Sequence, residues 1–214
     1  MSTLTKLALG AMGRLRPRPV QADPSSVVQL PAPDTSGGLP LMQALALRHS
    51  SREFKDEALP FPLLSSLLWA AWGVNRPDGG RTAPSAINAQ EIDLYVALPS
   101  GGYLYDAGSN CLQLVAPTDL RRITGYQDFV DKAPLDLVYV ADYTRMKRVP
   151  VAQRASYASA VAGAISQNVY LFAAANKLAT VIRAWIDRSA IADALGLSHD
   201  HDVLLSQTVG YPRD

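Results

Sequence analysis

The chain has 214 residues, of which 48% are hydrophobic and 18% charged, and its formal net charge is +1 at neutral pH. This length allows one sizeable hydrophobic core, and the composition is typical of an ordinary globular protein. The near-neutral charge gives no basic face for nucleic acid, and the single cysteine, Cys111, excludes an intramolecular disulfide. Because no uninterrupted apolar run reaches about 18 residues, we expect a cytoplasmic protein with no membrane and no nucleic-acid partner.

The first 38 residues differ in composition from the rest of the chain. The basic, proline-punctuated run Arg14-Leu15-Arg16-Pro17-Arg18-Pro19 is followed by further prolines and by Gly37-Gly38. Such composition favours extended, poorly packed chain over helix or sheet. We therefore predict a flexible arm over 1–38, which lies across a partner subunit, and a folded domain over 39–214. The alternative of an export signal after Lys6 is weaker, because its apolar stretch is short and soon interrupted by an arginine.

The first part of the domain alternates between helical and strand periodicity. Apolar residues at helical spacing predict a short helix over 39–48 and a second helix that begins after Pro60 and ends at Gly73. Turn residues predict a loop over 75–84, and apolar residues at every second position predict a strand over 92–98. A turn at Gly101-Gly102 lets the next residues pair back as a hairpin.

The second part of the domain contains one long helix. Val161, Ile165, Val169 and Phe172 fall on one helical face within 151–176, and its many small residues favour close approach of another helix near a subunit interface. The other predicted elements are a short helix over 119–123 capped by Thr118, strands over 135–141, 179–182 and 203–209, and a helix over 189–195 that Gly196 ends. Strands and segregated helices without strict alternation indicate an α+β fold with one mostly antiparallel sheet.

Common catalytic motifs are missing from the sequence. It contains no G-x-G-x-x-G, no P-loop and no G-x-S-x-G, which disfavours a dinucleotide fold, a phosphate-loop enzyme and a serine hydrolase. The run His199-Asp200-His201-Asp202 offers ligand atoms but no identifiable third ligand, so we interpret it as a solvated loop and predict no metal site.

Three other segments carry groups that suit a polar, anionic ligand. The first, Arg48-His49-Ser50-Ser51-Arg52-Glu53-Phe54, combines two guanidiniums with hydroxyls, which fits a phosphate, although a solvated helix end would explain it equally well. The second, residues 81–90, contains small residues and the amides Asn88 and Gln90, which can match a polar ring edge. Its alternative is an ordinary cap, Ser85, that opens a helical turn. The third, Val209-Gly210-Tyr211-Pro212-Arg213, ends a strand and leaves Arg213 free to face an anion.

Together these segments resemble the nitroreductase-like flavoprotein family over residues 40 to 214. The family's Arg-x-Ser-x-Arg motif is matched at residues 48–52, and its Pro-Ser-x-x-Asn-x-Gln motif at residues 84–90. Residues 131–134, 166–171 and 195–212 also look like family stretches. Within the family, the run Gly80 to Ser85 and the hairpin Gly102 to Asp106 resemble the branch that includes azoline-forming peptide dehydrogenases.

The resemblance implies a three-layer α+β fold and a two-fold homodimer with one FMN in each of two sites at the subunit interface. By the family's pattern, Arg48, His49, Ser50 and Arg213 hold the FMN phosphate. Arg52 lies by the pyrimidine edge, and Gln127 matches a family polar position near the ring.

The resemblance also divides the site between the two subunits. The partner contributes Pro84, Ser85, Ala86 and Asn88, and the strand end Ile182-Arg183-Ala184 supplies the backbone N–H that faces flavin N5. Tyr126, Trp185 and Tyr211 are candidate substrate contacts. Two departures from the family stand at Arg183 and Trp185, where smaller or acidic residues are common; such a bulky pair would narrow the pocket or select an anionic substrate.

The function implied is NAD(P)H-driven hydride transfer through the flavin to a nitroaromatic, quinone or similar small-molecule acceptor, with no catalytic acid or base assigned. Two alternatives stay open: an FMN-dependent dehydrogenase that oxidises a heterocycle or peptide in a biosynthetic pathway, and a flavin-binding or storage protein without turnover.

Overall fold

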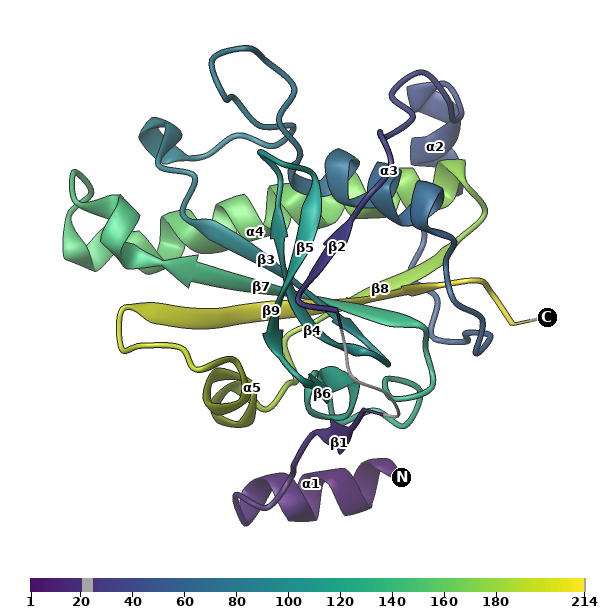
Figure 1. Cartoon of the computed structure of the whole chain (residues 1–214), viewed down its shortest axis with the longest axis vertical. Helices are drawn as coiled ribbons and strands as arrows, with labels where there is room; N and C mark the ends of the chain where they lie inside the picture. The colour runs from purple at the N-terminus through teal and green to yellow at the C-terminus, as the bar shows by residue number, and fades with distance from the viewer. Residues whose placement is uncertain (21–24, 214) are drawn as a thin grey trace.

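The computed structural model describes residues 1–20 and 25–213 (Figure 1). Its α-helices are α1 (Thr3–Ala11), α2 (Leu41–Leu47), α3 (Phe61–Trp72), α4 (Val151–Ala175) and α5 (Arg188–Leu195). Its strands are β1 (Arg18–Pro19), β2 (Val27–Gln29), β3 (Ile92–Leu98), β4 (Gly101–Asp106), β5 (Cys111–Ala116), β6 (Thr118–Asp119), β7 (Leu135–Asp142), β8 (Ala179–Arg183) and β9 (His201–Gly210). Three short 3-10 turns are η1 (Ala86–Asn88), η2 (Leu120–Ile123) and η3 (Tyr143–Met146).

Seven strands form one sheet in the order β2-β5-β4-β3-β7-β9-β8, and each neighbouring pair is antiparallel. The remaining two strands, β1 and β6, pair antiparallel with each other. This arrangement confirms the predicted α+β fold with a mostly antiparallel sheet.

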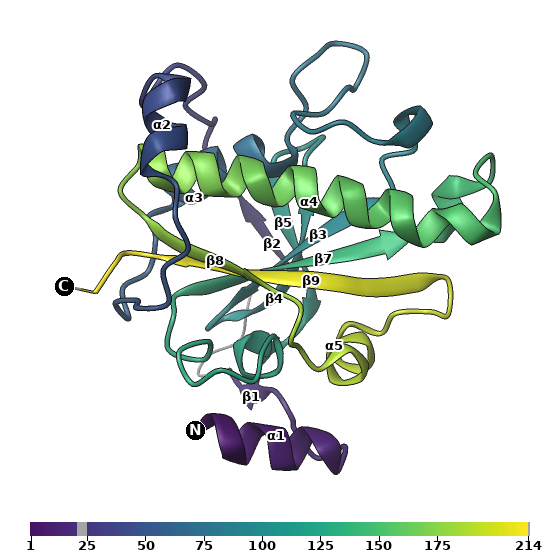
Figure 2. The same ribbon diagram turned by 180° about the vertical axis from the view of Figure 1, so that it is seen from behind.

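Helices cover both faces of the sheet and make three layers (Figures 1 and 2). The alternation in β3 explains this, because Ile92 and Leu94 belong to the core shared with α3 and α4, whereas Tyr95 and Ala97 belong to the core shared with α5 and η2. A strand that sends successive side chains to opposite faces needs an apolar layer on each when both faces are buried.

Helix α4 is the one segment of the described residues that is long and apolar enough to cross a membrane by length and composition. In this fold, 44% of its apolar window is buried inside the protein, and it packs on α2, α3 and the sheet. A core helix passes the same composition test, because its buried face must be apolar.

Most elements predicted from the domain sequence are present. The helices over 39–48, 60–73 and 151–176 correspond to α2, α3 and α4, and Gly196 ends α5 with a left-handed φ of 64°. One predicted cap was wrong: the side chain that accepts the backbone N–H at the start of η2 belongs to Asp119, not Thr118. Strand β5 was not predicted at all.

The N-terminal segment differs from the extended, poorly packed chain that its composition predicted. Residues 3–11 form α1, and Lys6 on this helix is fully buried. The Lys6 ammonium lies 3.0 Å from a carboxylate oxygen of Asp131 and donates a 2.9 Å hydrogen bond to the carbonyl of Gln127. Further along, β2 joins the edge of the main sheet. A buried ion pair of this kind holds α1 against its own chain, which the proline-rich composition could not reveal.

Candidate functional site

The first and third predicted segments lie side by side at one end of the molecule. The amide of Arg213 donates to the carbonyl of Glu53 at 3.2 Å, and the amide of Lys55 donates to the carbonyl of Tyr211 at 3.0 Å. Strand β8 joins the same group, because the amide of Ser51 donates to the carbonyl of Thr180 at 3.0 Å (Figure 2). Backbone pairing therefore brings the Arg48–Arg52 motif, residues 211–213 and the first half of β8 together.

Tyr170 on α4 lies at the junction of these segments. Its hydroxyl is 2.8 Å from the Ser50 hydroxyl and accepts a hydrogen bond from the Ile182 amide at 3.1 Å. The guanidinium carbon of Arg48 lies 5.3 Å from the centre of the Tyr170 ring, within the range of a cation–π contact. One buried side chain thus contacts both the basic motif and β8, although no role for Tyr170 was predicted from the sequence.

Three guanidiniums in this region form no ion pair within the part of the chain that the structure describes. Among residues 1–20 and 25–213, no carboxylate forms an ion pair with Arg48, Arg52 or Arg213. Two of these arginines, Arg52 and Arg213, line a cavity of about 340 Å³ together with Glu53, Phe54, Asp128, Phe129 and Lys132. Unpaired arginines next to a serine hydroxyl are the donor set that a phosphate or another oxyanion requires.

The second predicted segment lies elsewhere in the same chain. Pro84, Ser85 and Ala86 line a cavity of about 330 Å³ against the N-terminal half of α4, beside Ala160. The lining residue of α4 nearest to Tyr170 in sequence is Ala164, which lies about 9 Å before it along the helix at its usual rise. Within one chain the second segment, with Asn88 next to it in sequence, therefore contacts a different part of α4 from the basic motif.

The backbone of this second segment is strained. Ile87, Asn88 and Gln90 have φ values of 51°, 53° and 50°, and left-handed backbone is rare for a β-branched residue such as Ile87. The predicted cap was partly wrong, because the Ser85 hydroxyl accepts the amide of Gln90 rather than an amide of η1. Backbone strain of this kind occurs preferentially at functional sites. Ile87 is also 63% exposed.

The side chain of Arg183 is buried in the interior, contrary to the prediction that it faces the pocket. We expected its side chain to narrow a pocket or select an anionic substrate, but the residue is only 5% exposed and points into the protein. Its guanidinium forms a 2.7 Å ion pair with Asp136 and donates to the Thr208 hydroxyl at 2.7 Å and to the Thr124 carbonyl at 2.6 Å.

This ion pair lies in the low-dielectric interior. Burial raises the pKa of Asp136, and the Arg183 charge opposes that rise. The side chain bridges β8 to β7 across β9, so it stabilises the sheet and its charge is already matched.

The other predicted residues near the flavin ring lie in two places. Tyr126 and the half-exposed Trp185 form a tilted pair with ring centres 5.6 Å apart, beside α1 and the start of α5. The Gln127 side-chain oxygen is buried without a hydrogen-bond partner. Ala184 is exposed at the end of β8, whereas Tyr211 is half-buried next to the segment 53–55.

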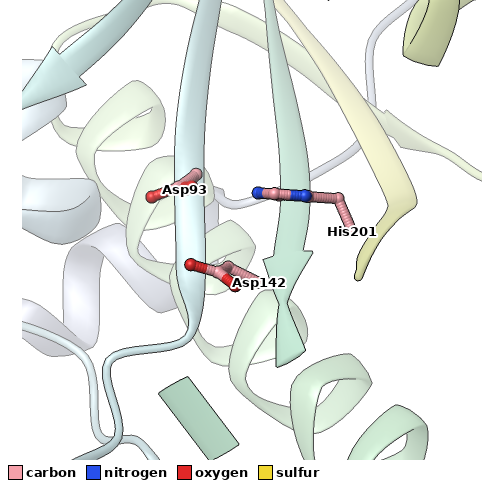
Figure 3. Close-up of side chains that lie close together, drawn as sticks. All are labelled: Asp93, Asp142 and His201. Atoms are coloured by element: carbon pink, nitrogen blue, oxygen red, sulfur yellow. The ribbon is translucent and has the colours of Figure 1, made fainter. Parts of the chain in front are cut away.

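One cluster of possible metal ligands is present in the described residues. Asp93, Asp142 and His201 place ligand atoms within 4.8 Å of one another (Figure 3). Arg145 already pairs with both carboxylates, at 2.5 Å to Asp93 and 2.9 Å to Asp142, so one guanidinium occupies the position that a cation would share. This arrangement is that of an ion-pair network at the ends of β3 and β7.

Comparisons with known proteins agree with this geometry. The model of the nitroreductase family matches residues 45–211. A crystal structure from Ralstonia eutropha, named as a nitroreductase, has a TM-score of 0.89 and 48% identity, and covers 94% of this chain and 96% of its own. A Methanocaldococcus jannaschii protein with a nitroreductase name is 30% identical over 151 residues, which are 66% of this chain and 76% of that protein. A crystal structure from Desulfovibrio desulfuricans, named as a nitroreductase in complex with FMN, shares the fold at a TM-score of 0.60 and 23% identity, covering 82% of this chain and 88% of its own. The chain belongs to the nitroreductase family and is an oxidoreductase of the flavoprotein type.

Proposed function

We propose that the protein is an FMN-dependent NAD(P)H oxidoreductase that works as a homodimer in the cytoplasm. The observation that carries this proposal has two parts. Arg48, Arg52 and Arg213 form no ion pair with a carboxylate of residues 1–20 or 25–213, and Arg48 and the Ser50 hydroxyl both contact Tyr170. Arg52 and Arg213 are exposed and Arg48 is half-buried, so all three guanidiniums are accessible to a ligand, and the FMN phosphate has the charge and the acceptor oxygens to match them.

The residues present fit the rest of the cofactor as well. Bound FMN supplies two-electron redox chemistry at its ring. Arg48, Ser50 and Arg213 would bind the phosphate, His49 lies between the first two, and the more distal Arg52 would contact the ring edge.

The edge of β8 supports the predicted contact with the ring. Because backbone N–H groups alternate along a strand, the N–H of Ala184 is directed to the same side as that of Ile182, whose N–H faces away from β9 toward Tyr170. The Ala184 N–H is therefore the donor that we assign to flavin N5. With its side chain in the interior, Arg183 contributes only backbone to the site.

The homodimer follows from the position of the second segment. Pro84, Ser85 and Ala86 lie against Tyr157 to Ala164 of α4, before the turn that carries Tyr170, so we assign the contact of this segment with FMN to a second copy. Helix α2 and the start of α3 also carry exposed apolar side chains, including Leu41 at 62%, Met42 at 75% and Phe61 at 51% exposed. Large exposed apolar groups gathered on neighbouring elements are typical of a protein–protein interface.

We assign substrate binding to the aromatic pair of Tyr126 and Trp185, whose rings can pack against a flat ring such as a nicotinamide, a nitroaromatic or a quinone. Buried Arg183 offers no free charge to an anionic substrate, which removes the reason for expecting one. It also removes one of the two substitutions that suggested a storage protein without turnover.

The test is flavin reduction under anaerobic conditions. FMN-loaded protein should lose its oxidised flavin absorbance when NADH or NADPH is added, and regain it when a nitroaromatic or quinone follows. Flavin that binds but is reduced by neither nicotinamide would contradict the reductase. It would favour either the dehydrogenase that oxidises a heterocycle or peptide or the flavin-binding protein without turnover.

A further inference from the structure

Tyr170 connects the two parts of the candidate site through a single hydroxyl. The residue is 6% exposed, and its position in the C-terminal half of α4 places it under both the Arg48–Arg52 motif and β8. The inference below rests on the proposed FMN site, since it concerns how this chain prepares Ser50 for the phosphate.

The direction of the hydrogen bonds follows from which groups can donate. The Ile182 backbone group at the contact is an N–H, so at 3.1 Å it donates and the Tyr170 oxygen accepts. The contact of 2.8 Å between Tyr170 and Ser50 permits either hydroxyl to donate. Because the tyrosine oxygen already accepts from the amide, its own proton is best used toward the serine oxygen, and the serine proton is then left for a third group.

We propose that Tyr170 is a positioning residue that directs the Ser50 hydroxyl proton toward a phosphate oxygen of FMN. The chain of donors runs from the Ile182 amide through the tyrosine hydroxyl to the serine hydroxyl and ends at the anion. Successive hydrogen bonds in a partly buried chain polarise one another, so each strengthens the next. The Tyr170 ring face meanwhile holds the guanidinium of Arg48, the neighbouring phosphate ligand, at 5.3 Å.

This role differs from that of an ordinary buried tyrosine. A tyrosine that only fills space contributes to folding and affects every ligand of the site alike. A tyrosine that directs the Ser50 proton acts on the phosphate alone, and it acts through Ser50.

The experiment compares FMN with riboflavin, which has the same ring system but no phosphate. Dissociation constants are measured by fluorescence quenching with the flavin-free full-length protein for wild type, Tyr170→Phe, Ser50→Ala and the double variant. Tyr105→Phe is the matched control, because Tyr105 is likewise only 5% exposed and lies on strand β4, away from the site. The substitution removes one hydroxyl contact, the hydrogen bond from Tyr105 to Asn110. Thermal unfolding of all variants checks that the two phenylalanine substitutions perturb folding to a similar degree.

We expect Tyr170→Phe to raise the dissociation constant of FMN about fivefold to tenfold and to leave that of riboflavin unchanged. In the Ser50→Ala background, the same substitution should have less than about half of this effect, because the group through which it acts is gone. The Tyr105→Phe protein should bind both flavins like wild type.

Equal weakening of FMN and riboflavin, or full additivity with Ser50→Ala, would overturn the proposal and leave Tyr170 as a packing residue. Wild-type FMN affinity in the Tyr170→Phe protein would overturn it as well. Failure of the wild-type protein to bind either flavin is a separate result, because it contradicts the FMN site itself.

Discussion

Replacing Arg183 by methionine tests whether this residue belongs to the interior or to the pocket. Its side chain is 3% exposed, and that of its partner Asp136 is fully buried. Methionine removes the ion pair, and the hydrogen bonds to Thr124 and Thr208, while it keeps most of the side-chain volume. Asp136 would then remain as a buried charge without its guanidinium.

The expected loss of unfolding free energy is about 3–5 kcal/mol, because breaking one side of a buried pair leaves an uncompensated charge. For a chain of this size, that corresponds to a lowering of Tm by roughly 10 °C. The assay is equilibrium unfolding in denaturant at fixed protein concentration, followed by thermal unfolding. A second variant, Arg183→Met with Asp136→Leu, should recover much of the loss, because well-packed apolar residues often replace a buried pair at little cost.

The matched control is an exposed ion pair. Arg76 and Asp78 lie 3.8 Å apart with side chains 56% and 77% exposed, so Arg76→Met should cost less than about 1 kcal/mol. If Arg183→Met unfolds like wild type and instead changes only the KM for a nicotinamide or an acceptor, then Arg183 faces the substrate and the structural reasoning is refuted.

Four further predictions concern other parts of the chain. Arg213→Ala should raise the dissociation constant of FMN about tenfold with little change in Tm, which a flavin titration checks and which an unchanged constant would contradict. Lys6→Met should destabilise the docking of α1 by about 2 kcal/mol and open residues 1–20 to limited proteolysis, whereas wild type resists. Burial raises the pKa of Asp131, but the charges of Lys6 and Arg18 outweigh burial and hold the pKa below 3.8. The stability that ionised Asp131 contributes is therefore complete at neutral pH and is lost as the pH falls through the lowered pKa. An unfolding free energy that does not change below pH 4 would count against this prediction. Gly196→Ala should cost about 1 kcal/mol in unfolding free energy, since φ is 64° at this helix end.

Most of the domain's helices and strands could be predicted because their information is local, although β5 was missed. Apolar residues recur at helical spacing in α3 and α4 and at every second position in β3, and each pattern has one structural solution. The basic motif could be predicted for a related reason: Arg48, Ser50 and Arg52 stand close together in sequence, so their chemistry is visible before folding.

The burial of Lys6 and Arg183 was not predicted because it depends on partners that are distant in sequence. Lys6 is buried because Asp131 receives it, and Arg183 is buried because Asp136 lies across β9; neither carboxylate is near its partner in sequence. A charged residue at a strand end is usually exposed, so the sequence alone favoured the pocket. Tyr170 was missed for the same reason, since its two hydrogen-bond partners come from segments that only the fold brings together.

To test whether two copies of the chain complete one flavin site, FMN is titrated into flavin-free protein and the mass of the loaded protein is measured in solution. We expect saturation at one FMN per chain and a mass twice that of a single chain. FMN binding should be lost when Ser50 and Arg213 are both replaced by alanine. A protein that stays monomeric, or that binds no FMN when the flavin is in large excess, would contradict the claim that two copies complete one flavin site.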